Sequence, residues 1–467
     1  MCPALRLRTF AIVLLILVTA CSPAATATPA EPPSPTAMPA TAISGPTLAP
    51  APTQPAATIV ATDHAPLNIP AEALVITNGM VIVADGSDPI SDGVVVIKQD
   101  RIIAVGHSND FAIPQGVRVV DAHGGTIMPG IINAHVHGLA HPALRHVYFL
   151  DKGVTAICDM AARLSEMSTF KQDDRTQLAA RGFRAGPIIS APGGYPGVYW
   201  GSAIGYEVAN PAAAKAAVDD LADRDADVIK MAIEPGGPAQ PWPSLTLEDA
   251  SAIVQEAHAR GLLVRAHVGR TEGTTVMKII EESGLDVIDH VPIPVFSAID
   301  AYNLIKDKAH YRIDVDYEAR LKSLVDHGIT MVPTLDAHTL WCESPRLTTQ
   351  QKQACLDFYL QPVNRFHVLG GTVALGNDYG ADSAIANGMP LREMKLLLAA
   401  GLTPLEVIEA GTRNSAYVCG HGDELGTLRV GKLADVIVVD GNPLNDIEAM
   451  QHLIAVVING QTAYEAK

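Results

Sequence analysis

The chain has 467 residues, of which 48% are hydrophobic, and its 50 acidic against 33 basic residues give a formal net charge of −17. An acidic chain without a basic tract is not expected to bind nucleic acid, and six cysteines are too few for a disulfide scaffold. Length and apolar content indicate a large globular protein of two or three units, or one barrel with an appendage.

Residues 1–20 have the pattern of an export signal. Arg6 and Arg8 precede the apolar run of residues 10–18, which is too short to span a bilayer comfortably. The ending Val18-Thr19-Ala20-Cys21 resembles a bacterial lipobox. Cys21 is therefore expected to be lipidated and to become the first mature residue. The alternative is an ordinary secretory peptide with an incidental cysteine.

The next segment has the composition of a tether. Residues 22–70 contain 12 Pro, 13 Ala and 8 Thr, so they cannot build a core and should stay extended and disordered. Together with Cys21 they predict an envelope lipoprotein outside the cytoplasm. Its contact with the membrane is expected through the lipid anchor only.

Both ends of the remaining chain contain short β-branched runs separated by Gly and Asp turns, which predict strands. These runs cover residues 74–79, 93–97 and 101–105 near the N-terminal end, and 426–428, 434–440 and 453–460 near the C-terminal end. We therefore expect one small β-sandwich formed by residues 71–129 and 423–467.

The central part, residues 130–422, alternates apolar strands with helical stretches. The eight predicted strands cover residues 130–135, 153–159, 185–191, 226–232, 262–267, 285–290, 328–334 and 371–378. The links between them carry apolar residues at helical spacing, as residues 247–260 do. This α/β pattern predicts a (β/α)8 TIM barrel, whose active site should lie at the C-terminal ends of the strands.

Polar side chains gather at those predicted strand ends. Six of them come from five different strands: His135, His137, Lys230, His267, His290 and Asp378. Imidazole and carboxylate groups are typical ligands of zinc and related divalent metals, and a lysine inside an apolar strand is costly unless neutralised or paired. Each residue alone has a structural explanation, but the set predicts a metal centre.

The chain resembles the amidohydrolase superfamily over about residues 74–467. The resemblance is carried by Met128-Pro129-Gly130, Asn133-Ala134-His135-Val136-His137, Ala226-Asp227-Val228-Ile229-Lys230, Ala266-His267, Ile288-Asp289-His290, Gly376-Asn377-Asp378, Thr403-Pro404-Leu405-Glu406 and Gly431-Lys432-Leu433-Ala434-Asp435-Val436. The order and spacing of its motifs are similar to those of the imidazolonepropionase-like and prolidase-like branch. The chain departs from that branch in two places. Residues 192–197 stand where the branch often has a Gly-Gly-His-Gly motif, and Asp289-His290-Val291 stands where it usually has Glu-His-Gly. These departures leave the metal residues unchanged and concern the specificity for dipeptides.

The resemblance implies a site with two divalent metal ions, of which zinc is the expected kind. The six strand-end residues would hold them: His135, His137 and Asp378 the more buried ion, His267 and His290 the other, and an N-carboxylated Lys230 as the bridge. Asp378 would also act as the catalytic general base and then as the general acid.

The loop after the third predicted strand concentrates aromatic residues in a chain that is only 5% aromatic. Tyr195, Tyr199 and Trp200 are predicted to form a wall for an apolar group of the substrate, although a packed loop would look the same. Arg270 could bind a substrate carboxylate or form a surface salt bridge. His338 could donate a hydrogen bond to the substrate.

Two cysteines, Cys342 and Cys355, are 13 residues apart between the seventh and eighth predicted strands. Outside the cytoplasm they could pair and pin that segment.

The predicted function is hydrolysis of an amide C–N bond in a small substrate, such as a dipeptide or an N-acyl amino acid, by a metal-bridging hydroxide with Asp378 as acid and base. The alternatives are a cyclic amide hydrolase or an esterase-like or lactonase-like member. From a different class comes a non-catalytic envelope lipoprotein that binds a solute, which would be expected to have lost ligands. The expected partner is a small molecule, and assembly into a homo-oligomer stays open.

Overall fold

A computed structural model describes residues 67–170, 178–237, 240–269, 274–292, 315–380, 385 and 387–466. The predicted signal peptide, Cys21, residues 22–66 of the tether and Arg270 lie outside these ranges. None of the described helices is long and apolar enough to cross a membrane.

The described residues begin at Leu67, within the segment predicted to be the tether. Strand β1 (Leu67–Asn68) pairs with β5 (Phe111–Ala112), and Ile69 is buried. These contacts fix the end of the predicted tether to the folded part.

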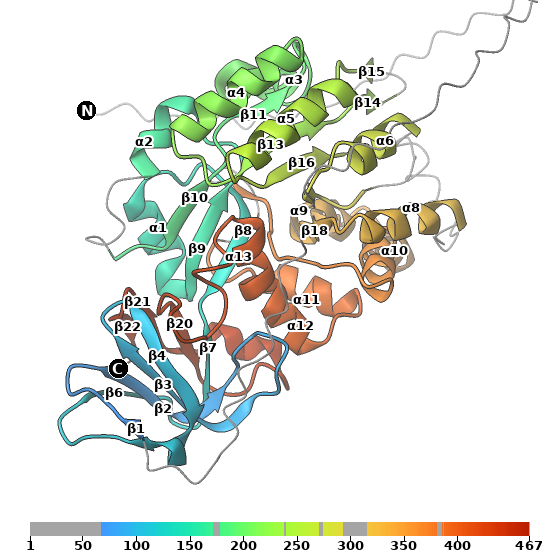
Figure 1. Ribbon diagram of the computed structural model, residues 1–467. Coiled ribbons are helices and arrows are strands. Elements are labelled where there is room, and N and C mark those ends of the chain that lie inside the picture. Colours follow the sequence, from blue (N-terminus) through green and yellow to red (C-terminus); the bar gives the residue numbers. More distant parts are fainter. Residues whose placement is uncertain are drawn as a thin grey trace, which may run out of the picture. The chain divides into compact units, whose positions relative to one another are not determined.

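The two ends of the folded chain form one mixed sheet of eight strands, seen in blue and dark red in Figure 1. Its strands are β2 (Leu74–Val81), β3 (Ile90–Lys98), β4 (Arg101–His107), β6 (Arg118–Asp121), β7 (Thr126–Pro129), β20 (Val436–Val439), β21 (Leu453–Ile458) and β22 (Gln461–Glu465). Antiparallel pairing of β7 with β20 joins the two halves. Bulges bend the sheet, and strands of both ends share one buried apolar cluster.

Strand β20 serves both parts of the fold because successive side chains point to opposite faces. Val436 and Val438 belong to the apolar cluster of the terminal sheet, whereas Ile437 and Val439 belong to the cluster that fills the barrel layers. The predicted run 426–428 does not form a strand.

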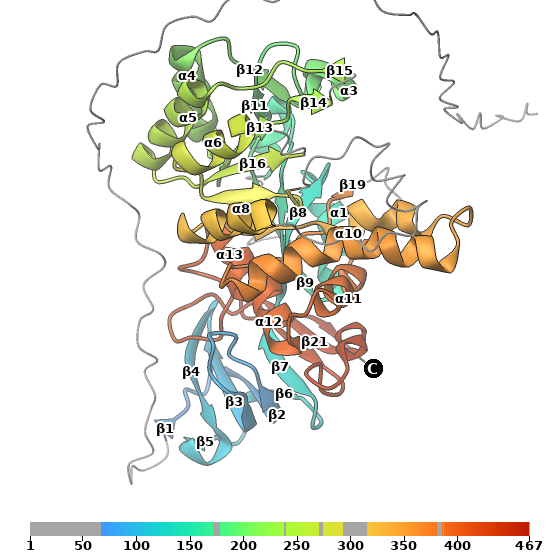
Figure 2. The ribbon, with the colours of Figure 1, turned by 90° about the vertical axis from the view of Figure 1, so that its right-hand side faces the viewer.

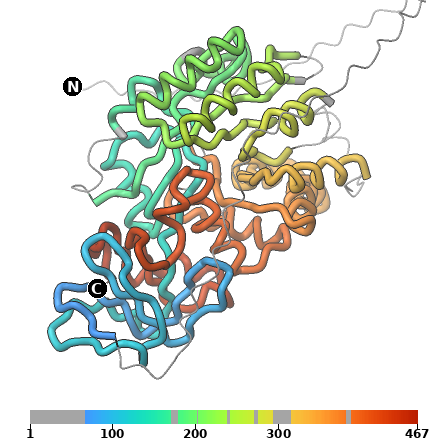
Figure 3. Tube along the Cα trace, in the orientation of Figure 1, coloured from blue at the N-terminus to red at the C-terminus, as the bar shows by residue number. Residues whose placement is uncertain are grey.

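The centre is a ring of eight parallel segments. They are β8 (Ile131–His137), β9 (Val154–Asp159), the pair β10 (Arg181–Arg184) and β11 (Ile188–Ser190), β13 (Ile229–Ile233), β16 (Val264–Val268), β17 (Val287–Asp289), β18 (Thr330–Val332) and residues 372–378. Met331 bridges to Val373, Ala134 donates to the carbonyl of Leu375, and β19 (Tyr379–Gly380) pairs with β8. These contacts close the TIM barrel. In Figure 3 the first and last segments of the barrel can be followed by their colours.

Two barrel strands differ from their predicted form. The third is divided by Gly186, whose φ is +75°, and Pro187, so that β10 pairs with β9 while β11 pairs with β13. The eighth has a ladder contact only at Val373. Here the backbone passes so close to β8 that a Cβ on Gly376 would lie 2.6 Å from that of His135.

Helices follow most strands, as α5 and α6 do beside β13 and β16 in Figure 2. The α-helices are α1 (Pro142–Tyr148), α2 (Met167–Phe170), α3 (Gly197–Trp200), α4 (Pro211–Asp223), α5 (Leu247–Ala259), α6 (Thr274–Glu282), α8 (Val315–Asp326), α9 (Leu335–Thr339), α10 (Thr349–Val368), α11 (Leu391–Ala399), α12 (Pro404–Glu409) and α13 (Ser415–Val418). Helix α5 begins at the predicted residue and ends one residue earlier than predicted, and Thr246 caps its first turn. Short strands β12 (Gly205–Glu207), β14 (Gly236–Gly237) and β15 (Gln240–Pro241) lie in the connections.

A disulfide joins Cys342 and Cys355, whose Cα atoms are 5.5 Å apart. It connects the 3₁₀ helix η5 (Leu340–Glu343), which follows α9, to α10. The segment after β18 is therefore attached covalently to the long helix beside it.

Arg181 of β10 and Asp435, next to β20, form a largely buried two-point ion pair at 2.7 and 2.8 Å. Breaking such a pair usually costs about 3–5 kcal/mol. Because Arg181 keeps a hydrogen bond to Asn459, Asp435→Ala is expected to lower the free energy of unfolding in urea by about 2–4 kcal/mol. Asp223→Ala, which removes an exposed partner of Arg260, should change it little; equal effects of the two variants would contradict the prediction.

Candidate metal centre

Five of the six predicted metal residues lie toward the C-terminal ends of the barrel strands, whereas Lys230 is the second residue of β13, two positions before the level of His267. The structure divides the six into groups. The ligand atoms of His135, His137 and Asp378 lie within 4.8 Å of one another. The rings of His267 and His290 are 4.5 Å apart, and the ring of His135 is 5.1 Å from that of His290. The sixth residue, Lys230, is paired with an acidic residue instead.

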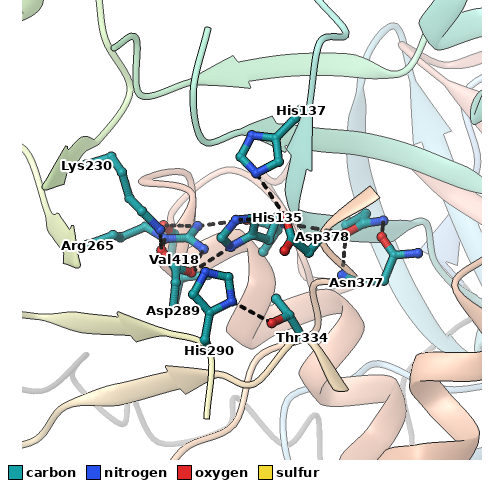
Figure 4. A network of polar contacts seen from close by, with 12 residues as sticks. His135, His137, Lys230, Arg265, Asp289, His290, Thr334, Asn377, Asp378 and Val418 are labelled. Carbon is teal, nitrogen blue, oxygen red and sulfur yellow. Dashed lines mark hydrogen bonds and ion pairs between the residues drawn. The ribbon is translucent and has the colours of Figure 1, made fainter. Parts of the chain in front are cut away.

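Asp378 links the two histidines of β8. Its Oδ1 lies 2.9 Å from Nε2 of His137 and 3.5 Å from Nε2 of His135 (Figure 4). Burial alone would favour the neutral acid, but His135 and His137 hold the pKa of Asp378 well below its ordinary value. The carboxylate is therefore ionised, as a metal ligand or a proton acceptor must be.

His267 and His290 form the second group. Burial lowers the pKa of both, and neighbouring histidines lower that of His290 further. Nδ1 of His290 lies 2.7 Å from Oγ1 of Thr334. When Nδ1–H donates to this hydroxyl, Nε2 keeps its lone pair for a metal ion.

Three residues at the strand ends have left-handed backbone conformations. The φ angles are +78° at His290, +48° at Thr334 and +58° at Asp378. Non-glycine residues seldom adopt this region, and a β-branched threonine is an outlier there. Such strain clusters at functional sites because the surrounding structure must maintain it.

Below the histidines lies a buried ionic network that the predictions missed. Asp289 of β17 is fully buried and accepts hydrogen bonds from Lys230, Arg265 and His135, the last at 3.0 Å from Nδ1 (Figure 4). Arg265 also donates to the carbonyl of Ala134 at 2.8 Å. Arg265 stands two residues before His267 in an apolar strand, and this charged position was the available signal.

The network orients His135 and holds Lys230. With Nδ1 of His135 engaged by Asp289, Nε2 faces Asp378. Lys230 is fully buried, and burial lowers its pKa to about 8 even though Asp289 opposes the shift. An amine with this pKa has a substantial neutral fraction near pH 8, which is the form that can react with carbon dioxide.

Glu234, at the end of β13, is a further residue that the predictions missed. Its Oε2 lies 3.8 Å from Nε2 of His267, and its Oε1 accepts from the backbone of Gly236 at 2.9 Å. A Cβ on Gly269 would lie 1.4 Å from Oε2, so any larger residue there would displace the Glu234 carboxylate from its present place.

The predicted substrate residues surround the second group. Tyr195 stacks on His267 at 4.1 Å, Trp200 packs on Tyr195 at 5.7 Å, and Tyr199 packs on Trp200 at 5.5 Å. The ring of His338 lies 5.1 Å from that of His290.

The segment that carries His338 rests on Glu393 of α11. This fully buried carboxylate accepts from the backbone N–H groups of Leu335 and Asp336, and burial raises its pKa to about 8. Arg392 in turn donates to Asp336 at 2.6 Å. Glu393 could not be identified from the sequence, because its partners are backbone groups 57 and 58 residues away.

Histidines and an aspartate converging at the strand ends of a TIM barrel define a metal-binding hydrolase. The family model described as "Amidohydrolase family" matches residues 126–463, and the chain belongs to this family. This match confirms the proposed resemblance to the amidohydrolase superfamily, and imidazolonepropionases are among the relatives. The protein is thus an enzyme that hydrolyses C–N bonds.

Three relatives illustrate the range of the similarity. The chain is 26% identical to ochratoxinase from Aspergillus niger, over 83% of this chain and 85% of that protein; the crystal structure of A. niger ochratoxinase matches with a TM-score of 0.67, at 22% identity over 85% and 96%. A Xaa-Pro dipeptidase structure matches with a TM-score of 0.66, at 20% identity over 85% of this chain and 100% of that chain. N-acyl-D-aspartate deacylase from Alcaligenes xylosoxydans xylosoxydans is 35% identical over 21% of this chain and 19% of that protein.

Asp289→Asn tests the buried network. In the metal-free protein, where Lys230 is an uncarboxylated amine, the change leaves two buried cations without their carboxylate, so we expect a loss of about 3–5 kcal/mol in the free energy of unfolding. Because His135 also loses its orienting partner, metal affinity should fall about 10–100-fold. Urea unfolding and metal titration measure the two effects.

The control is Asp286→Asn, just before β17, where the carboxylate accepts from Val264 N and pairs with His258. It should cost about 1–2 kcal/mol and leave metal affinity unchanged. Unaltered metal affinity in Asp289→Asn would show that the network does not support the centre.

Proposed function

We propose that the protein is a binuclear metal-dependent amidohydrolase that cleaves the amide bond of a small substrate, an N-acyl amino acid or a dipeptide. The observation that carries the proposal is the convergence of His135, His137 and Asp378 within 4.8 Å, beside the contacting rings of His267 and His290.

The donor set suits two divalent ions, and zinc is the metal we propose. Six residues would hold them: His135, His137 and Asp378 the first, His267 and His290 the second, with N-carboxylated Lys230 as the bridge. Carboxylation would convert a costly buried amine into an anionic ligand. Two divalent ions bound there would polarise the substrate carbonyl and lower the pKa of a water molecule.

Asp378 is the proposed acid–base residue. Its carboxylate is ionised and its side chain is 24% exposed, so it lies next to both histidines of β8 and is still accessible. It would accept the proton of the attacking water and then deliver it to the leaving nitrogen, which makes amine departure favourable.

The names of two relatives support the substrate class. A deacylase of N-acyl-D-aspartate and a Xaa-Pro dipeptidase both act, by their names, on an amide attached to an amino acid. All six metal residues are present, which favours an enzyme over a solute-binding lipoprotein.

We also propose that Cys21 is lipidated and tethers the folded part to a membrane of the cell envelope. The Pro-, Ala- and Thr-rich residues 22–66 would then act as an extended spacer. The proposed partners are the small substrate and, through the lipid, the membrane.

Metal analysis of the full chain tests the binuclear centre. The parent should contain about two divalent ions per chain, and Lys230→Ala should lose most of them together with hydrolysis of N-acyl amino acids. Lys215→Ala, which removes an exposed lysine paired with Glu256, should behave as the parent. One ion or none in the parent, unchanged in Lys230→Ala, would refute the lysine-bridged centre.

Asp378→Asn tests the proton transfer. The amide cannot accept the proton, so kcat/KM for amide hydrolysis should fall about 10²–10⁴-fold. Asp423→Asn, at an exposed position, is the matched control and should retain activity. Near-parental kcat/KM in a well-folded Asp378→Asn protein would assign the acid–base role elsewhere.

A further inference from the structure

The eighth barrel segment, which carries Asp378, has little regular strand pairing. In the part of the chain that the structure describes, it pairs as a strand only at Val373 and at β19. Between these points single hydrogen bonds hold it to β8. The N–H of Ala134 donates to the carbonyl of Leu375, and the N–H of Asp378 donates to the carbonyl of His135, both at 2.9 Å. A regular ladder therefore does not set the position of Asp378 beside the histidines of β8.

Two buried asparagines connect the first and eighth barrel segments at this level. Nδ2 of Asn133, on β8, donates to Oδ1 of Asn377 at 2.7 Å, and the backbone N–H of Asn377 donates to Oδ1 of Asn133 at 3.3 Å. Figure 4 shows Asn377 directly beside Asp378. The two side chains, here called the amide clamp, thus join residues that are 244 positions apart in the sequence.

Each amide of the clamp also holds the backbone next to a candidate ligand. Oδ1 of Asn133 accepts from the N–H of His135 at 3.4 Å, and Oδ1 of Asn377 accepts from the N–H of Tyr379 at 3.2 Å. Both bonds reach the residue two positions on, which is the Asx-turn pattern. The second bond spans Asp378, whose φ of +58° is seldom adopted by a residue other than glycine. The clamp therefore supports the strained conformation that presents the Asp378 carboxylate.

The roles of the two side chains require carboxamides. Asn133 accepts through Oδ1 and donates through Nδ2, whereas an aspartate would lack the donor and a serine has one oxygen for both roles. Beyond the clamp, the Asn377 amide faces Asp336, a buried carboxylate that also accepts from Arg392 at 2.6 Å. Burial raises the pKa of Asp336, and the Asn377 amide opposes this rise. Because the polar atoms at both ends of each amide have partners, the orientation of the clamp is fixed.

We propose that Asn133 and Asn377 are positioning residues that act as one unit and hold Asp378 against His135 and His137, so that the three can share a metal ion. They act through the ligands rather than on the ion or the substrate. The inference rests on the proposed metal-dependent function and concerns how its first metal position is formed.

The experiment is a double-mutant cycle with Asn133→Ala, Asn377→Ala and the double variant. Zinc is titrated into the metal-free full chain against a chelating dye, and the absorption spectrum is recorded with cobalt(II) in place of zinc. Each single variant should bind zinc about 10–100-fold more weakly, as expected for loss of a group that orients a ligand, and its cobalt spectrum should change. Since the two amides act as one unit, the double variant should lose little more than either single variant.

Asn414→Ala is the matched control. Asn414 is also an amide that holds the eighth segment, but it donates to the carbonyl of Val373 at 2.8 Å, away from the candidate ligands. This variant should lower the urea midpoint of the metal-free protein as Asn377→Ala does, because each leaves a polar group of the segment unpaired. Its zinc affinity and cobalt spectrum should stay parental. An equal loss of zinc affinity in Asn414→Ala would overturn the proposal, and so would multiplying losses in the double variant.

Crystal structures of the metal-free parent and of Asn377→Ala distinguish failure of the clamp from failure of the metal function. In the variant, Oδ1 of Asp378 should leave its 2.9 Å contact with Nε2 of His137. If Asn377→Ala does not fold, Asn133→Ala, which retains the Asx turn over Asp378, takes its place.

Zinc binding by the parent that is unchanged in the clamp variants would leave the metal-dependent function standing and reject the clamp. A parent that binds no divalent ion, together with a displaced Asp378 in the variant, would reject the metal function and support the clamp as the element that positions this carboxylate. No metal binding and no displacement would overturn both.

Discussion

The site depends on one buried carboxylate. Asp289 is fully buried and receives hydrogen bonds from an arginine, a lysine and a histidine that belong to three other barrel strands. An arginine in the barrel interior would be prohibitively costly without this partner. Asp289 balances the charges of the interior and connects β8, β13, β16 and β17. It also turns the imidazole of His135 toward Asp378. The geometry of the candidate ligands is thus set one layer beneath them.

Above this layer, the site is held by groups that would be unfavourable elsewhere. Left-handed residues end two strands and the irregular eighth segment, and buried Glu393 fixes the turn after β18 through two backbone N–H groups. These features cost free energy locally, and the close-packed barrel offsets that cost. Their concentration at one end of the barrel separates a binding region from a stabilising region at the other end, as the fold generally does.

The barrel and the six candidate metal residues could be predicted because they follow from patterns along the chain: the period-two alternation within each strand and the order of the strands. The expected places of His135, His137 and Asp378 followed from where strands end, and the structure brings their ligand atoms together. Asp289, Glu234 and Glu393 could not be assigned in this way, since each role depends on a partner brought close only by tertiary packing. The division of the third strand was missed because the Gly-Pro step lies inside an apolar run, and the sequence does not show that the strand changes its pairing partner there.

The double role of β20 has a consequence for how the chain folds. β7 and β20 are about 310 residues apart in sequence, yet their pairing joins the halves of the terminal sheet, while Ile437 and Val439 cover barrel surface. A contact of such sequence separation forms late, because a long loop must close before it is gained. While the first 430 residues are being synthesised, an apolar face of the barrel therefore stays uncovered and a sheet edge stays unpaired. Pairing of the last strands covers both and ends this aggregation-prone period.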